Sequence, residues 1–137
     1  MAIKVGVGVS DNLSGVGAVS EAISKSISDF GNVFPKVLIL FVSINYEKEL
    51  KKILAEAKKI LPKTKVVGCT GAAIIASEGV YPRGIGVMAI GGDLDVGVGL
   101  GRNSRTLPEL AGENSMKQAL KDLGKSKYKN KFAFAFV

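Results

Sequence analysis

Short apolar segments alternate with amphipathic ones over the first half of the chain, and this order constrains the fold more than any other feature. Bulky residues at every second position predict a strand over residues 3–9, and the run KVLILFVS predicts a buried strand over residues 36–43. A third strand is expected over residues 65–69. Apolar residues spaced three and four apart predict helices between them, over residues 15–30 and 46–61. This order is typical of α/β folds with parallel strands.

The second half has a different pattern. Residues 83–90 and 94–100 both alternate, and the Gly-Gly-Asp between them predicts an antiparallel hairpin. A helix is expected over residues 107–123 and a last strand over residues 131–137. The predicted fold class is therefore α/β: a mixed β-sheet with a parallel βαβαβ part, an antiparallel hairpin and about three packing helices. No internal repeat is evident.

The length of 137 residues suits one domain, residues 1–137, with a real core. Because the last apolar strand is followed by no turn signal, the chain is expected to be a C-terminally truncated piece of a longer protein. The first residues lack the apolar stretch of a signal peptide, and no window is apolar enough to cross a membrane. With one cysteine and thus no internal disulfide, the expected location is cytoplasmic.

The residues that are absent exclude several kinds of chemistry. The chain has no histidine, which removes serine–histidine and cysteine–histidine catalysis by this chain alone. One cysteine and no histidine also argue against a zinc site, and neither a metal nor a cofactor is expected. The segment GVGAVS, residues 15–20, resembles part of a dinucleotide fingerprint. However, the turn before it is too long, and the second strand ends without the acidic residue that would bind ribose.

The net charge of +7 comes largely from lysines near the C-terminus. Asp122 is the only acid among them, and Tyr128 the only aromatic residue. Without a recognised nucleic-acid motif, we interpret this tract as a solvated helix end and loop, and nucleic-acid binding is disfavoured. The cluster consists of Lys117, Lys121, Lys125, Lys127, Lys129 and Lys131.

Small polar residues follow each of the three predicted parallel strands. In open α/β sheets, ligands bind beyond the carboxyl ends of such strands, and polar groups converging there suit a small polar ligand. The sequence therefore predicts a ligand site at this edge of the sheet. The expected ligand-binding residues are Ser10, Asn12, Ser43, Asn45, Tyr46, Gly68, Cys69, Thr70 and Gly71.

Cys69 is open to three interpretations. It could be a small buried residue with a weak S–H group, or one wall of the ligand pocket. It could also be a nucleophile, if a short helix starting near Thr70 or Gly71 activated the thiol. Without histidine, the nucleophile is the least favoured of the three.

Four blocks of the chain resemble the N-terminal FIST domain, where FIST stands for F-box and intracellular signal transduction. The most specific block is VVGCT, which lies between an amphipathic helix and a G-x-G-V strand. The segment PELAGENSMKQAL fits the helix that the family carries after these blocks. The four blocks are VGVGVS, VLILFVS with Tyr46 just after it, VVGCTGAAI and GIGVMAI.

The resemblance implies a non-catalytic sensory domain of a signal-transduction protein that binds a small molecule such as an amino acid. Its implied partners are that ligand and either a C-terminal FIST half or a second copy of the chain, with no membrane. In the family, a Gly-Glu pair follows the Gly-Cys-Ser/Thr block; here Ala73 and Ile74 stand in its place, and Glu78 is the nearby acid. Two alternatives stay open: a protein–protein scaffold that pairs through the terminal strand, and a less favoured enzyme that uses Cys69.

Overall fold

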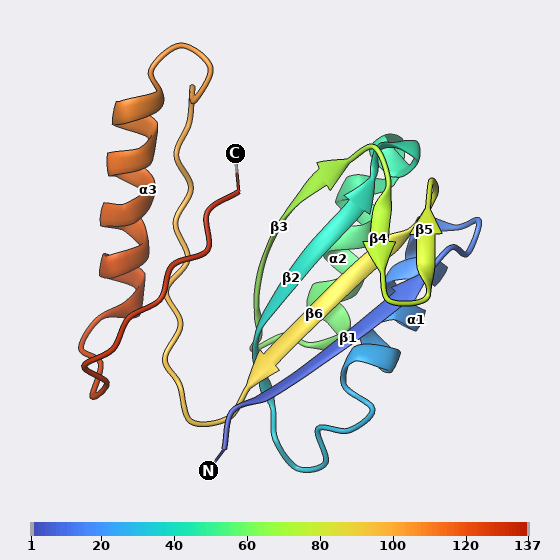
Figure 1. Cartoon of the computed structure of the whole chain (residues 1–137), viewed down its shortest axis with the longest axis horizontal. Helices are drawn as coiled ribbons and strands as arrows, with labels where there is room; N and C mark the ends of the chain where they lie inside the picture. The colour runs from blue at the N-terminus through green and yellow to red at the C-terminus, as the bar shows by residue number, and fades with distance from the viewer. Residues whose placement is uncertain (1, 137) are drawn as a thin grey trace. The chain divides into compact units, whose positions relative to one another are not determined.

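The computed structural model describes residues 2–136, which belong to two compact units (Figure 1). Unit 1 is Met1–Asp93 and unit 2 is Leu94–Val137. Unit 1 holds both β-sheets. Its elements are β1 (Lys4–Ser10), α1 (Gly15–Ser26), β2 (Pro35–Ser43), the 3-10 helix η1 (Ile44–Glu49), α2 (Leu50–Ile60), β3 (Lys65–Gly71), β4 (Ile74–Ala76), β5 (Gly79–Tyr81) and β6 (Ile85–Gly91).

The main sheet has the strand order β1-β6-β2-β3. β6 runs antiparallel to both β1 and β2, whereas β2 and β3 are parallel. β1, β2 and β3 therefore point the same way, and their carboxyl ends lie at one edge of the sheet. β4 and β5 form a separate two-stranded antiparallel sheet. The predicted fold class, an α/β mixed sheet with a parallel part, a hairpin and three helices, is confirmed.

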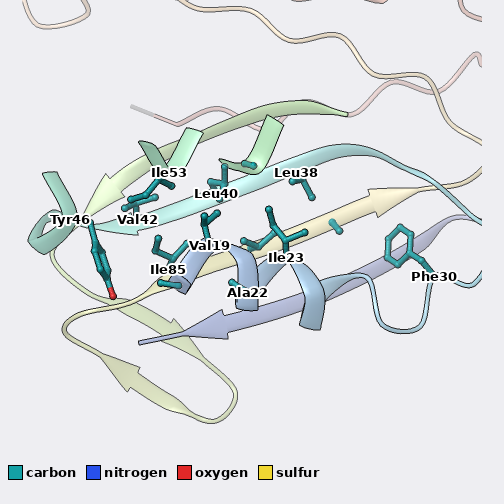
Figure 2. Packing of buried hydrophobic residues seen from close by; sticks show 14 residues of the cluster. Val19, Ala22, Ile23, Phe30, Leu38, Leu40, Val42, Tyr46, Ile53 and Ile85 are labelled. Atoms are coloured by element: carbon teal, nitrogen blue, oxygen red, sulfur yellow. The ribbon is translucent and has the colours of Figure 1, made fainter. Parts of the chain in front are cut away.

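Helices α1 and α2 cover the same face of the main sheet (Figure 1). Between helices and sheet lies the core, where Ile23 and Val19 of α1 and Ile53 of α2 meet Leu38 of β2 and Ile85 of β6 (Figure 2). These side chains are almost wholly removed from water, and their burial is the main driving force for folding unit 1.

Glycines on β1 explain how closely α1 approaches the sheet. A Cβ atom at Gly6 would lie 1.9 Å from the carbonyl oxygen of Ser26, and one at Gly8 would lie 2.1 Å from that of Ala22. Any side chain at these positions would push the helix away, because backbone atoms cannot move aside as a flexible side chain can. The bare face predicted for the first strand is thus the face that receives α1.

The predicted hairpin over residues 83–100 is wrong. Residues 85–91 form β6, but both of its edges are taken by β1 and β2, so no place is left for residues 94–100. Those residues belong to unit 2 and join neither sheet of the described chain. The hairpin that does form is β4–β5, over Ile74–Tyr81, which the sequence analysis did not predict.

Three boundaries also differ from the predictions. α1 ends at Ser26, four residues before the predicted end of the helix, and backbone hydrogen bonds hold the turns that follow. The first turn of the second predicted helix is the 3-10 helix η1, which the side chain of Ser43 caps at its N-terminus. β3 continues through Gly71, because residues 65–71 all pair with β2.

Unit 2 consists of α3 (Pro108–Leu123), close to the predicted helix, and the segments on either side of it. Residues 131–136 were expected to be a strand, but they form none in the described chain, and Val137 lies outside the described residues. An apolar alternating pattern becomes a strand only when another strand supplies hydrogen bonds along its edge. No such ladder forms in the described part of unit 2.

Candidate functional site

The predicted site residues at the end of β1 contact a carboxylate that the sequence analysis missed. The Ser10 hydroxyl donates a hydrogen bond to Glu21 of α1 at 2.5 Å, and the Asn12 amide donates to the same carboxylate at 2.8 Å. The Tyr46 hydroxyl donates to the backbone carbonyl of Asn12 at 2.6 Å. The structure thus brings Ser10, Asn12 and Tyr46 together: Glu21 accepts hydrogen bonds from Ser10 and Asn12, and Tyr46 joins them through the backbone of Asn12.

The predicted residues at the end of β2 hold the turn that leads into β6. The Ser43 hydroxyl donates to the carbonyl of Pro82 at 2.8 Å, and the Asn45 amide donates to the same carbonyl at 2.9 Å. The next residue, Arg83, lies over the ring of Tyr46, 5.0 Å from its centre, and donates to the carbonyl of Leu13 at 2.6 Å. These contacts join the ends of β1 and β2 into one network, in which Arg83 was also not predicted.

The predicted residues of β3 lie beside the β2 end of this network, where Gly71 is the register partner of Ser43, and farther from the end of β1. Gly68, Cys69, Thr70 and Gly71 are all exposed on the outer strand of the sheet. β3 is three strands away from β1, a separation of about 14 Å at the usual spacing between strands. The role of the nine predicted residues in binding a ligand stays a prediction.

Cys69 is exposed, so the interpretation that it is a buried core residue is wrong. The suggestion that a helix begins beside it is also wrong, because β3 continues through Gly71. Cys69 is the register partner of Phe41 in β2, and directly paired residues point to the same face of a sheet. The thiol therefore lies on the face opposite α1 and α2.

Hydrogen bonds to Glu21 change its acidity. The bond from Ser10 is the main cause and the bond from Asn12 the second; together they lower the pKa of the Glu21 carboxyl below its ordinary value of 4.5. The carboxylate is exposed and ionised at neutral pH. The one signal in the sequence that could have found Glu21 is its place on the helix that follows the polar end of the first strand.

We expect Ser10→Ala to raise the pKa of Glu21 back toward its ordinary value, since the strongest hydrogen bond to the charged form is lost. A carbon-detected NMR titration of the Glu21 carboxyl in both proteins measures this directly. An unchanged pKa in the variant would show that the Ser10 contact does not control it.

The lowered pKa of Glu21 makes the stability of the folded state depend on pH. Because its pKa is lowered on folding, the carboxylate stabilises the fold at pH values above the pKa of the unfolded chain. That contribution is lost as the pH falls through the lower pKa of the folded state. The network around Ser10 and Asn12 is therefore expected to loosen in acid.

A groove lies on the open face of the main sheet, between the sheet and the β4–β5 hairpin. Its volume is about 390 Å³, within the range of small-molecule sites. Gly86 makes room for the hairpin, because a Cβ atom there would lie 2.9 Å from Ile74, which is itself buried against the sheet. The lining residues are Val7, Val9, Phe41, Ile74, Ile75, Ala76, Ser77, Glu78, Gly86, Val87 and Met88.

The groove is apolar except at the hairpin turn, where Ser77 and Glu78 supply a hydroxyl and a carboxylate. Phe41, the register partner of Cys69, is part of its lining. A second hollow of about 390 Å³ lies near Phe30 and Pro35, and no acidic or basic side chain lines it. The hairpin groove is thus the hollow of the two that offers both an apolar surface and a charged group.

Two further findings concern residues 2–136. None of their helices combines the length and the hydropathy that crossing a bilayer requires. Over the same residues, no group of three or more cysteine, aspartate or glutamate side chains could hold a metal ion.

The chain matches the FIST N domain family over residues 36–137, which is more than half of its length. The matched part begins at β2 and includes β3, the hairpin, β6 and α3. No curated protein matches the chain. The match covers three of the four blocks that carry the resemblance, VLILFVS, VVGCTGAAI and GIGVMAI, whereas VGVGVS lies before it. The chain therefore belongs to the FIST N domain family, a family of sensory domains in signal transduction.

Proposed function

We propose that this domain senses a small molecule without catalysing its conversion, and that the ligand binds in the groove between the main sheet and the β4–β5 hairpin. The observation that carries the proposal is the groove itself, whose volume of about 390 Å³ suits a small molecule. The family's sensory role supports a ligand-binding function.

The polar network at the carboxyl edge is proposed to stabilise the structure rather than to bind the ligand. The side chains of Ser10, Asn12, Ser43 and Tyr46 already hydrogen-bond to other groups of the protein. Binding a ligand through them would require breaking those bonds, each worth about 1 kcal/mol. Their proposed role is therefore to hold the β1 and β2 ends and the turn at Pro82 in place.

The lining of the groove defines the class of ligand. An apolar floor of Val9, Phe41 and Met88 favours an apolar body, and the carboxylate of Glu78 favours a cationic amine. An amino acid with an apolar side chain combines the two. Glu78 would then supply the acid that the family's Gly-Glu pair supplies elsewhere, since Ala73 and Ile74 cannot do so.

A sensing role without catalysis also agrees with the chemistry of the groove. Glu78 is the one acidic or basic side chain among the groove's lining residues, and the chain has no histidine. Cys69 is exposed on the same face, so its reaction with an alkylating reagent would report exposure rather than catalysis.

We expect Glu78→Gln to weaken binding of L-leucine by about fivefold, since an exposed ion pair contributes about 1 kcal/mol. Calorimetric titration of the wild type and the variant measures the difference. Glu47→Gln is the matched control, because Glu47 is an exposed acid on η1 and does not line the groove. An equal loss in both variants would mean that net charge, not the groove, sets the affinity.

Three related small molecules test separately whether the amine and the apolar body of the ligand contribute to binding. L-leucine and isopentylamine both carry an amine and an apolar body, whereas 4-methylpentanoate lacks the amine. The first two are expected to raise the melting temperature of the protein, because a ligand that binds only the folded state stabilises it. Stabilisation by 4-methylpentanoate alone would overturn the assignment of Glu78.

A further inference from the structure

The β4–β5 hairpin, which forms the outer wall of the groove, is anchored to the rest of unit 1 at its base. Ile74 is the one buried residue of the hairpin, with 5% of its surface exposed. Ile75 and Val80 are register partners on the other face of the hairpin, and they are 82% and 65% exposed. Because elements with few buried contacts open at a low free-energy cost, the hairpin is a wall that is easily displaced.

Two glycines receive the buried side chain of the hairpin. A Cβ atom at Gly86 would lie 2.9 Å from Cγ2 of Ile74, and one at Gly84 would lie 3.7 Å from Cγ1. The same Cβ position at Gly84 is 3.4 Å from the carbonyl oxygen of Ser10 and 2.9 Å from Cβ of Tyr81. Gly84 thus lies between the anchor of the hairpin and the end of β1. A shift of Ile74 therefore reaches the carboxyl edge of the sheet through a single residue.

The chain that leaves the hairpin makes a second connection to the carboxyl edge. Tyr81, the last residue of β5, is followed directly by Pro82 and Arg83. The carbonyl of Pro82 is held from the end of β2, as described above, whereas the guanidinium of Arg83 donates to the carbonyl of Leu13 at 2.6 Å. A displaced hairpin would therefore move the side chain that holds the backbone of Leu13.

The loop between β1 and α1, residues 11–14, has little packing of its own. None of its residues is buried, and Leu13 is 76% exposed. Within the loop, the N–H of Asn12 donates to the hydroxyl of Ser10 at 3.2 Å, and the N–H of Ser14 donates to the side chain of Asn12 at 3.0 Å. Water can replace such bonds at exposed positions, so the order of the loop depends on contacts from outside it, such as the guanidinium contact at Leu13.

We propose that the turn at residues 82–84 couples the groove to the loop 11–14, so that a ligand that fixes the β4–β5 hairpin also orders this loop. The ligand part of the inference rests on the proposed function, whereas the coupling is a property of the fold alone. Packed groups and hydrogen bonds carry such coupling, and here Gly84 and Arg83 supply them. Occupancy of the groove thus changes the surface of unit 1 at a second place, which a sensory domain needs in order to report its ligand.

Amide exchange, measured by NMR on the whole 137-residue chain, tests the coupling without a ligand. Ile74→Val removes one methyl group from the buried anchor of the hairpin. We expect it to speed the exchange of the Asn12 and Ser14 amides by about fivefold. It should have no further effect in a protein that already carries Arg83→Met, because methionine keeps an apolar side chain at this position but cannot donate the hydrogen bond to the loop.

Two controls separate the coupling from a general loss of stability. Val80→Ala alters an exposed side chain of the same hairpin, so it should change the exchange of the two loop amides by less than about twofold. The amide of Val33 donates to the carbonyl of Phe30, in the loop at the other end of α1, and should keep its exchange rate in every variant. An equal increase at Val33 in the Ile74→Val protein would mean that the whole unit opens, and would overturn the inference.

A titration with L-leucine tests the effect of the ligand. Saturating L-leucine should slow the exchange of the two loop amides by about fivefold in the wild type and leave them unchanged in Arg83→Met. Calorimetry should give both proteins a similar affinity, because Arg83 does not line the groove.

Two results of these experiments would overturn the inference. In one, L-leucine binds without slowing the exchange of the loop amides. In the other, Ile74→Val leaves these amides unchanged, or speeds their exchange as much with Arg83→Met as without it. If L-leucine does not bind, the proposed function fails, and the exchange rates of the variants still decide whether the hairpin and the loop are coupled.

Discussion

Replacing Tyr46 with alanine is expected to lower the free energy of unfolding of unit 1 by about 4 kcal/mol, the usual cost of deleting a buried aromatic ring. Tyr46 is 1% exposed and belongs to the core between the helices and the sheet. The truncation would leave a cavity at the carboxyl edge. It would also remove the ring beneath Arg83 and the hydroxyl that binds Asn12. Urea unfolding followed by circular dichroism measures the loss.

Tyr46→Phe separates the ring from the hydroxyl. It keeps the packing and deletes only the donor to the Asn12 carbonyl, so the expected cost is about 1 kcal/mol. If Tyr46→Phe were as destabilising as Tyr46→Ala, the hydrogen bond and not the ring would hold the edge together. If neither variant were destabilised, Tyr46 would not be part of the core.

Replacing Gly6 with alanine is expected to destabilise unit 1 by about 3 kcal/mol, at the upper end for overpacking. The new Cβ atom would lie 1.9 Å from the carbonyl oxygen of Ser26, and a backbone atom cannot turn away. Either α1 must shift from the sheet or β1 must bend. The same urea unfolding measurement reports the change.

Gly71→Ala is the matched control for this prediction. Gly71 also lies in a strand of the main sheet, but a Cβ atom there would meet only the Ala73 carbonyl oxygen at 3.5 Å, an ordinary contact. The control should change stability by no more than about 0.5 kcal/mol, as most surface substitutions do. Equal effects of the two substitutions would show that general glycine effects, rather than the close helix–strand contact, explain the result at Gly6.

The local elements of unit 1 could be predicted because each carries its own periodicity. The alternation from Val5 to Val9 and the continuous run over residues 36–43 both gave strands, and the helical spacing after Gly15 gave α1. The partner of β6 could not be predicted. Its pattern favours a strand, but only the tertiary structure decides that β6 fills the space between β1 and β2 instead of pairing with residues 94–100.

The rule that ligands bind at the carboxyl ends of parallel strands drew attention to Ser10, Asn12 and Tyr46, which form one hydrogen-bond network; their role in binding a ligand stays a prediction. Glu21 and Arg83 were missed because their contacts depend on how α1 and the turn before β6 pack. The groove was missed because its outer wall is the β4–β5 hairpin, whose strands of three residues leave almost no periodic signal.

The most direct test of the central claim, that the domain senses an amine with an apolar body, is a methyl NMR titration with L-leucine. We expect shifts confined to the groove, at Val7, Val9, Ile74, Ile75 and Met88, and weaker binding in Glu78→Gln. Shifts centred on Ile27, Val33 and Leu61, which line the other hollow, would show that the ligand does not bind in the groove. So would a spectrum that no amino acid or amine changes.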